Sequence, residues 1–299
     1  MSGVVVGLLN VHKPTGPTSH DIVAAVRRGT GVRRVGHAGT LDPLAQGVLV
    51  LALGQATRLL EYLAGSNKQY DARLQLGVET DTYDAEGEVL RREDVPATLT
   101  AEEVAAALAS FRGDIQQVPP VYSALKVGGR AAYARARAGE QVELKPRHVT
   151  IYELELTRFA PPFADLRVVC SAGTYIRSLA HDLGQALGTG AMLAGLVRTA
   201  SGSFTLAGAV PWPALTRGFD EGSWREFLLP ADLALEGAPQ VRLGAEGLQD
   251  LIHGRAIAGD AVQGGLARAY APDGQFVGVL EGDPAAGVWR PRKVLARAM

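Results

Sequence analysis

Cysteine is almost missing from this chain, since Cys170 is the only one. A single cysteine excludes an internal disulfide and any zinc site built from several cysteines. Long apolar runs are missing too: the longest, residues 47–54, is far too short to span a bilayer. The start, Met1-Ser2-Gly3, has no basic region before the short apolar stretch that follows, so it does not indicate a signal peptide. We therefore expect a cytoplasmic protein that does not span a membrane.

The chain also lacks an excess of charge of either sign, with 30 basic and 31 acidic residues and a net charge of −1. Bulk charge alone does not indicate a nucleic-acid-binding protein. The basic residues nevertheless gather in three groups, and many acidic residues lie between Glu79 and Glu103. The basic groups are Arg27, Arg28, Arg33 and Arg34; Arg130, Arg135, Arg137, Lys145 and Arg147; and Arg290, Arg292, Lys293 and Arg297. Such segregation can build a positive face on a neutral protein, although any one group alone is more typical of ordinary solvated arginines.

The length of 299 residues predicts about two domains. We expect a larger domain over residues 1–235 and a small β-rich module over residues 236–299. Strand and helix patterns interleave without a regular βαβ rhythm, which favours an α+β fold with a mixed sheet. Expected strands are residues 4–9, 48–53, 70–76, 150–156, 166–171, 261–270, 275–280 and 289–295. Expected helices are residues 18–28, 56–63, 100–111, 174–187 and 192–198, with Thr18, Thr100 and Thr174 as N-caps.

The most informative segment is residues 35–49, Val-Gly-His-Ala-Gly-Thr-Leu-Asp-Pro-Leu-Ala-Gln-Gly-Val-Leu. Its glycines free the backbone for a tight loop. The loop presents His37 and Asp42 five positions apart, just before a buried strand, and reactive groups are often placed on loops held by rigid elements. From the residues alone, Asp42 is more often the start of a turn. A loop histidine such as His37 is likewise more often a surface or hydrogen-bonded residue.

This segment resembles the signature loop of the TruB family of pseudouridine synthases, which is close to Gly-His-Thr-Gly-(Thr/Ala)-Leu-Asp-Pro-Leu-Ala-x-Gly. Ala38 is the main departure, because threonine is usual there. Further blocks resemble the family in its order from about residue 7 to residue 206. They are residues 9–19, 68–70, 77–87, 119–126, 171–179 and 196–199. Seven blocks in the right order are a far more specific match than one Asp-Pro loop.

The resemblance implies that Asp42 is the catalytic carboxylate, that Tyr70 packs against the target base and that Arg177 pairs with Asp42. Taken alone, Tyr70 is more typical of an ordinary strand aromatic. Arg177 falls in the first turn of an expected helix, where a cation is unfavourable to the helix dipole. A carboxylate facing Arg177 would explain its place, and a nearby cation would help keep Asp42 ionised.

The remaining site residues are also implied by the resemblance. Tyr175 would contact the target base, and Leu196 would form an apolar wall of its pocket, although a core residue of a short helix is an equally good interpretation of Leu196. His37 would fill the space that the extruded base leaves in the RNA loop. Lys13 and Lys126 lie in matching blocks and would contact RNA.

The resemblance further implies a reaction, the conversion of uridine 55 in the T loop of tRNA to pseudouridine. This isomerisation gains no atom and involves no redox change, so it needs neither cofactor nor metal. The sequence has no P-loop, no Gly-x-Gly-x-x-Gly after a strand and no His/Cys ligand set, and the acidic residues 77–87 lack the glycine and flanking helices of a calcium loop. Asp42 could add to C1′ or to C6, or remove the C2′ proton, and all three routes stay open.

The same resemblance predicts a basic insertion at about residues 127–148 that clamps RNA, and a C-terminal PUA-like RNA-binding module. The expected partner is the T arm of tRNA, bound by a monomer that requires no protein partner. Two alternatives remain open. One is a related synthase that acts on ribosomal RNA, and the other is a protein that binds tRNA and assists its folding.

Overall fold

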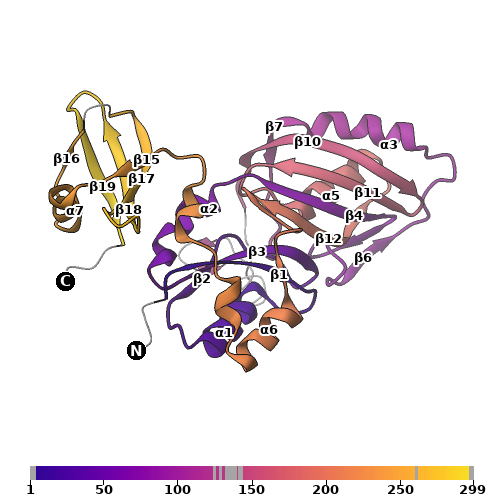
Figure 1. Ribbon diagram of the computed structural model, residues 1–299. Helices are drawn as coiled ribbons and strands as arrows, with labels where there is room; N and C mark the ends of the chain where they lie inside the picture. Colours follow the sequence, from indigo (N-terminus) through magenta and orange to yellow (C-terminus); the bar gives the residue numbers. More distant parts are fainter. Residues whose placement is uncertain are drawn as a thin grey trace.

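The computed structural model describes residues 5–123, 126–127, 130–131, 140, 144–259 and 262–295. A ten-stranded sheet dominates the fold (Figure 1). Its strands are β1 (Gly7–Lys13), β2 (Val35–His37), β3 (Ala45–Leu53), β4 (Lys68–Leu76), β7 (Gly113–Gln117), β10 (Arg147–Ala160), β11 (Phe163–Cys170), β12 (Ala191–Ser201), β13 (Phe204–Thr205) and β14 (Val210–Pro211). They follow the order β14-β1-β3-β12-β4-β11-β10-β7, with β13 on β12 and β2 on β3. Because parallel pairs β1–β14 and β3–β12 stand among antiparallel ones, the sheet is mixed, which confirms the predicted α+β class.

Helices and short hairpins surround this sheet. The helices are α1 (Ser19–Thr30), α2 (Leu60–Ala64), α3 (Ala101–Ala107), α5 (Ile176–Ala186) and α6 (Trp212–Glu221), with 3-10 segments η1 (Gly54–Leu59), η2 (Leu108–Phe111), η3 (Trp224–Phe227) and η4 (Ala231–Leu235). The hairpins are β5 (Val78–Thr80) with β6 (Val89–Arg92) and β8 (Lys126–Val127) with β9 (Arg130–Ala131). In the part of the chain that is described, no helix is both long and apolar enough to cross a bilayer.

Strand β3 lies at the centre of the fold because its residues are buried on both faces of the sheet. One set of alternating side chains packs into a core with α1 and α5, and the other packs into a core with η1, α2 and η4. The first set is Leu49, Leu51 and Leu53, and the second set is Val48, Val50 and Ala52. A continuous apolar run is what a strand covered on both faces requires, so the predicted buried strand is confirmed.

Helix α1 begins as its sequence predicts. The hydroxyl of Thr18 accepts the backbone N–H of Asp21, and the Asp21 carboxylate accepts the backbone N–H of Thr18, which completes a capping box. Ile22, Val23 and Val26 are buried on one face of the helix. This packing fixes the start of α1 beside the loop that follows β2.

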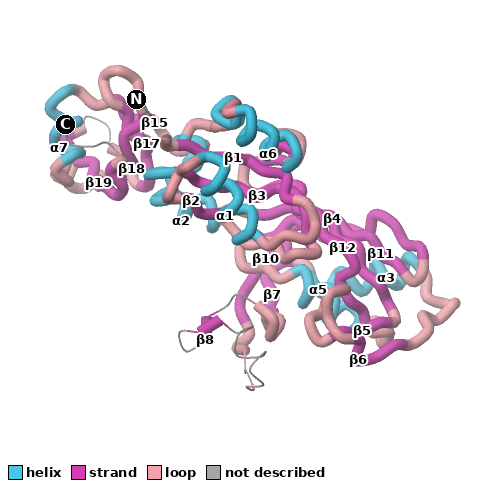
Figure 2. Tube along the Cα trace, turned by 90° about the horizontal axis from the view of Figure 1, so that it is seen from below, coloured by secondary structure: helices cyan, strands magenta, loops and turns pink. Residues whose placement is uncertain are grey.

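The C-terminal module contains a five-stranded sheet of order β15-β17-β18-β19-β16. Its elements are β15 (Gln240–Arg242), α7 (Ala245–Ile252), β16 (Ile257–Ala258), β17 (Gly265–Tyr270), β18 (Phe276–Asp283) and β19 (Val288–Val294). The module has its own core around Leu251 and Trp289 and lies at the opposite end of the molecule from the β5–β6 hairpin (Figure 2). It meets the larger domain where the Tyr270 hydroxyl donates to Asp232 at 2.6 Å and where Lys293 pairs with Glu61. The predicted β-rich module is confirmed, whereas the boundary at residue 235 stays a prediction.

Two local predictions are wrong. Residues 192–198 form part of strand β12 and not a helix, because β12 pairs with β3 on one side and β4 on the other. Periodicity alone cannot separate a short buried strand from a short buried helix. Thr174 does not cap α5: its hydroxyl donates to the carbonyl of Ser171 at 3.0 Å, and Tyr175 occupies the N-cap position without a side-chain capping bond.

Candidate active site

Asp42 lies in the loop between β2 and β3, and α1 anchors this loop on one side. The buried hydroxyl of Ser19 donates to the carbonyl of Leu41 at 2.9 Å and accepts the N–H of Leu41 at 2.8 Å. Both backbone polar groups of Leu41, the residue before Asp42, are therefore fixed by the first residue of a helix. This arrangement sets the direction in which the carboxylate leaves the backbone.

Arg198 anchors the same loop from the other side. Its guanidinium, on β12, donates to the carbonyls of Gly39 at 3.1 Å, Thr40 at 3.3 Å and Val48 at 2.7 Å. Gly39 has a φ of +121°, a conformation that glycine adopts without strain. Arg198 is fully buried, so its hydrogen-bond donors are satisfied by these backbone carbonyls, and the loop packs over its guanidinium.

Arg177 pairs with Asp42 as the resemblance implies, and it also contacts a second carboxylate. Its Nε lies 3.0 Å from Oδ2 of Asp42, and its Nη1 lies 3.4 Å from Oδ2 of Asp84. The guanidinium also donates to the carbonyls of Thr82 at 3.2 Å and Tyr122 at 3.0 Å. The Arg177 side chain is 7% exposed, whereas that of Asp42 is 39% exposed. Arg177 thus holds Asp42 in place while leaving part of the carboxylate accessible.

Burial raises the pKa of Asp42 above its ordinary value, and this effect outweighs the others. The positive charge of Arg177 opposes the rise, and the negative charge of Asp84 adds to it. The carboxylate keeps some exposed surface, yet protein surrounds it at longer range and reduces its hydration. Arg177 therefore favours the ionised form of Asp42 against a burial cost that it does not fully cancel.

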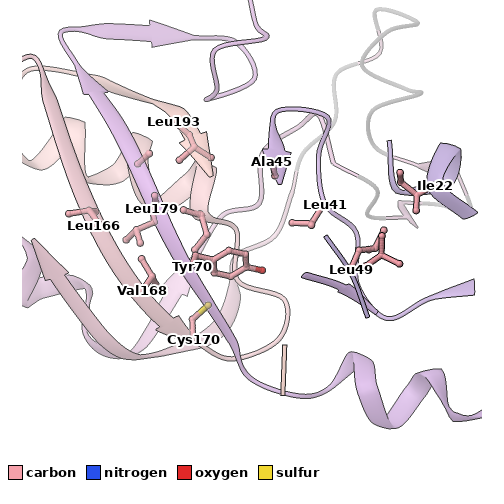
Figure 3. Close-up of a cluster of buried hydrophobic side chains, with 14 of the residues drawn as sticks. Ile22, Leu41, Ala45, Leu49, Tyr70, Leu166, Val168, Cys170, Leu179 and Leu193 are labelled. Atoms are coloured by element: carbon pink, nitrogen blue, oxygen red, sulfur yellow. The ribbon is translucent and has the colours of Figure 1, made fainter. Parts of the chain in front are cut away.

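A cavity of about 250 Å³ opens beside this ion pair. Five of the predicted site residues line it: Asp42, Tyr70, Tyr175, Arg177 and Leu196. The ring of Tyr70 lies among Val168, Leu179 and Cys170, with its hydroxyl pointing toward the side of Leu41 (Figure 3). The cavity is smaller than the roughly 300–1,000 Å³ of pockets for drug-sized ligands. Its size suits a single flat ring between tyrosine and leucine side chains.

His37 is not among the described residues that line this cavity. His37 ends β2, its ring lies edge-on to that of His20 with centroids 5.5 Å apart, and burial lowers its pKa. Its Nδ1 is buried without a hydrogen-bond partner among the described residues. The side chain of Lys126 lies outside the described residues, as does most of the insertion predicted at about residues 127–148.

Lys13 was expected to contact RNA, and the structure shows it fully buried beneath the Asp42 loop. Its ammonium donates to the carbonyls of Pro14 at 2.9 Å and Ala45 at 2.7 Å, and burial lowers its pKa to about 8. Through its bond to Ala45, Lys13 supports the end of the Asp42 loop. Its side chain has no exposed surface in this structure, so it presents no cation at the protein surface.

Sequence reasoning missed three residues of the site: Lys68, Asp84 and Arg198. Lys68 lines the cavity and donates to the carbonyl of Ser66 at 2.6 Å, and burial lowers its pKa to about 8. Asp84 lies in the block of residues 77–87, which resembles the family, but neither that resemblance nor the comparison with a calcium loop assigned Asp84 a role. Arg198 directly follows the apolar Leu196 and Val197, and this position at the end of an apolar stretch was the signal that could have indicated a buried role.

Comparison with known families covers nearly the whole chain. The model "TruB family pseudouridylate synthase (N terminal domain)" matches residues 27–176. The model "tRNA pseudouridylate synthase B C-terminal domain" matches residues 177–236, and "Pseudouridine synthase II TruB, C-terminal" matches residues 239–295.

Relatives and solved structures agree with these matches. A protein of Dehalococcoides mccartyi named tRNA pseudouridine synthase B is 44% identical over 97% of this chain and 97% of its own, and one of the same name from Symbiobacterium thermophilum is 49% identical over 84% and 83%. A structure described as a Cbf5-Nop10-Gar1 complex has a TM-score of 0.74 at 28% identity, over 97% of this chain and 85% of that chain. Another, an H/ACA RNP bound to a substrate RNA containing 2'-deoxyuridine, has a TM-score of 0.72 at 26% identity with the same coverage. The chain therefore belongs to the TruB family of pseudouridine synthases.

Proposed function

We propose that this enzyme converts uridine 55 in the T loop of tRNA to pseudouridine, with Asp42 as the catalytic carboxylate. The observation that carries the proposal is the partly exposed Asp42 carboxylate, held 3.0 Å from Arg177 at the wall of a cavity lined by Tyr70, Tyr175 and Leu196. The names of the relatives support tRNA as the substrate. The choice of position 55 rests on the resemblance of the Asp42 loop to the family signature.

The reaction breaks the bond from N1 to C1′, turns the uracil and joins C5 to C1′; C5 loses its hydrogen as a proton and N1 takes up a proton, so no atom is gained or lost overall. It requires an ionised carboxylate close to the sugar and the ring. Asp42 supplies this group, and the charge of Arg177 favours the ionised form. Addition of Asp42 to C1′ or C6 and removal of the C2′ proton are all compatible with this geometry.

The cavity must also hold a base that has left its RNA stack. Extrusion costs a few kcal/mol, and stacking on an aromatic ring returns about 1–3 kcal/mol per base. Tyr70 on β4 would provide this stacking, and Leu196 on the adjacent strand β12 would close the apolar wall, since both line the cavity. Such walls would keep the freed uracil beside the sugar while it turns.

The main competing substrate is another RNA, such as ribosomal RNA, since a structural neighbour at 26% identity is described as an H/ACA RNP bound to a substrate RNA. The identity of 44–49% to proteins named tRNA pseudouridine synthase B favours tRNA. We also propose that the enzyme acts as a cytoplasmic monomer without a protein partner, which sizing of the pure active protein would test.

The substrate assignment is tested by mapping which nucleotide of a tRNA the enzyme modifies. An unmodified tRNA transcript is incubated with the enzyme, and carbodiimide-blocked primer extension maps the product. We expect one stop, at uridine 55, and none in a matched transcript that carries cytidine at this position. Stops elsewhere, or product only in ribosomal RNA fragments, would contradict the assignment. Salt-sensitive tRNA binding without any product would favour the folding-factor alternative.

A further inference from the structure

The backbone of Tyr175 is held by a side chain from a different part of the sheet. Oε1 of Gln117 accepts the N–H of Tyr175 at 2.8 Å, and Nε2 of Gln117 donates to the carbonyl of Tyr175 at 3.0 Å. Gln117 is 2% exposed and is the last residue of β7, paired opposite Arg147 of β10. Its amide therefore projects from a rigid strand.

Side chains in the first turn of α5 are also anchored, since Arg177 pairs with Asp42 and the Ser178 hydroxyl donates to the carbonyl of Val118 at 2.7 Å, but these bonds do not involve the backbone of Tyr175. Tyr175 is the N-cap residue, with extended backbone angles and no side-chain capping bond. The hydroxyl of Thr174 turns back to Ser171, and Gly173 has a φ of +86°. Among the described residues, the carbonyl of Tyr175 also accepts the N–H of Leu179 as the first helical bond. The N–H of Tyr175, by contrast, depends on Gln117.

Glutamine is chemically suited to this contact, because its amide offers one acceptor and a donor side by side. It can match the N–H and the C=O of a single residue at once, which fixes both position and orientation. Tyr175 lines the cavity together with Asp42, and Arg177 follows two residues later. A shift at Tyr175 would therefore displace one wall of the cavity and the start of the helix that carries Arg177.

We propose that Gln117 is a positioning residue for the isomerisation: its amide fixes the backbone of Tyr175 and thereby the place of the Tyr175 ring in the cavity. This inference rests on the proposed function, because it assigns Tyr175 to the uridine. Gln117 itself does not line the cavity, so it acts through Tyr175 and not on the RNA.

Gln117→Met tests the proposal, since methionine keeps the length of the side chain and removes both hydrogen bonds. Displacements of about 1 Å at a reacting centre can cost about 100-fold in rate. We expect the single-turnover rate on tRNA to fall by about 10- to 100-fold, while the Kd for tRNA stays close to that of the wild type. Gln185→Met is the matched control, because Gln185 lies on α5 but is exposed and donates to the carboxylate of Glu79 at 2.9 Å. This control should stay within about twofold of the wild-type rate, as surface substitutions do.

Gln117→Glu separates positioning from loss of stability. The neutral carboxylic acid has the shape of glutamine and offers a donor and an acceptor, whereas the carboxylate offers acceptors only. The rate of this variant relative to the wild type at the same pH should therefore rise as the pH is lowered, and the ratio for Gln117→Met should stay flat. The charged groups on neighbouring elements, Arg147, His148 and Arg177, are the same in all these proteins and cancel in the ratios.

Three outcomes decide the matter. Wild-type rates from Gln117→Met, or a pH-independent ratio for Gln117→Glu, would overturn the positioning role. Loss of activity in Gln117→Met with recovery of Gln117→Glu at low pH would establish it, even if the methionine variant is less stable. Failure of the wild type itself to form pseudouridine would refute the proposed function instead.

Discussion

Replacing Arg177 with methionine should change the pH at which the enzyme becomes active. The substitution removes the cation 3.0 Å from Asp42 and keeps an unbranched side chain in the buried site. A cation this close lowers the pKa of an aspartate by about 1–3 units. Because the Asp42 side chain is 39% exposed, solvent screens part of this effect, so we expect a change toward the lower end of that range.

The sign follows from the charges around Asp42. Burial and Asp84 both raise the pKa of Asp42, and Arg177 is the largest opposing contribution. Without Arg177 the pKa rises further, so a smaller fraction of Asp42 is ionised on the acidic side. The acid limb of the pH–rate profile should therefore move to higher pH. The maximal rate should fall as well, because Asp42 loses the group that orients it.

The assay is single-turnover release of tritium from C5 of uridine in tRNA, measured between about pH 5 and 9. Arg91→Met is the matched control, because it also removes an arginine from an ion pair. The side chains of Arg91 and its partner Glu93 are 47% and 48% exposed, whereas that of Arg177 is 7% exposed. We expect this control to follow the wild-type profile. Full activity of Arg177→Met would refute the reasoning outright. A lower rate with an unchanged acid limb would show that Arg177 acts by position and not by charge.

Three further variants test the supports of the Asp42 loop and the cavity. Arg198→Met should lower the free energy of unfolding in urea by about 2–4 kcal/mol, because three carbonyls lose a charged donor. Ser19→Ala should lower it by about 1–3 kcal/mol and slow catalysis, since both peptide groups of Leu41 lose their partner. Lys68 has its pKa lowered from 10.5 to about 8, so the unfolded chain binds more protons between these values and wild-type stability rises with pH across this window. Lys68→Met should remove up to about 3 kcal/mol of that rise, measured by urea unfolding at about pH 7.5 and 10.

Much of the fold could be predicted because local signals and tertiary packing agree. Thr18 caps α1 and Thr100 forms a capping box with Glu103, as their positions predict, and the alternating residues of β4 are alternately buried and exposed. The wholly apolar run in β3 is buried on both faces. In each case the residues of a single element determine its structure, so the element can be predicted from the sequence without knowing which elements pack against it.

The failures depend on neighbours that the sequence does not reveal. The pattern of residues 192–198 predicts a helix, but these residues form part of strand β12. Their strand conformation depends on pairing with β3 and β4, which lie far away in the chain and are not indicated by the local sequence. Asp42, Tyr70 and Arg177 could be assigned from the family resemblance. The contacts of Arg198 and Gln117 could not, because each bonds backbone groups more than fifty residues away.

The role of Asp42 is tested most directly by comparing Asp42→Asn with Asp71→Asn in the tritium-release assay on tRNA. Asp71 is an exposed residue of β4 that lies between the buried Tyr70 and Ala72. Its substitution therefore controls for the loss of one carboxylate near the site. We predict wild-type release from Asp71→Asn and no release above background from Asp42→Asn, with tRNA binding and thermal stability preserved in both. Release by Asp42→Asn at a rate within about tenfold of the wild type would contradict the assignment of Asp42 as the catalytic carboxylate.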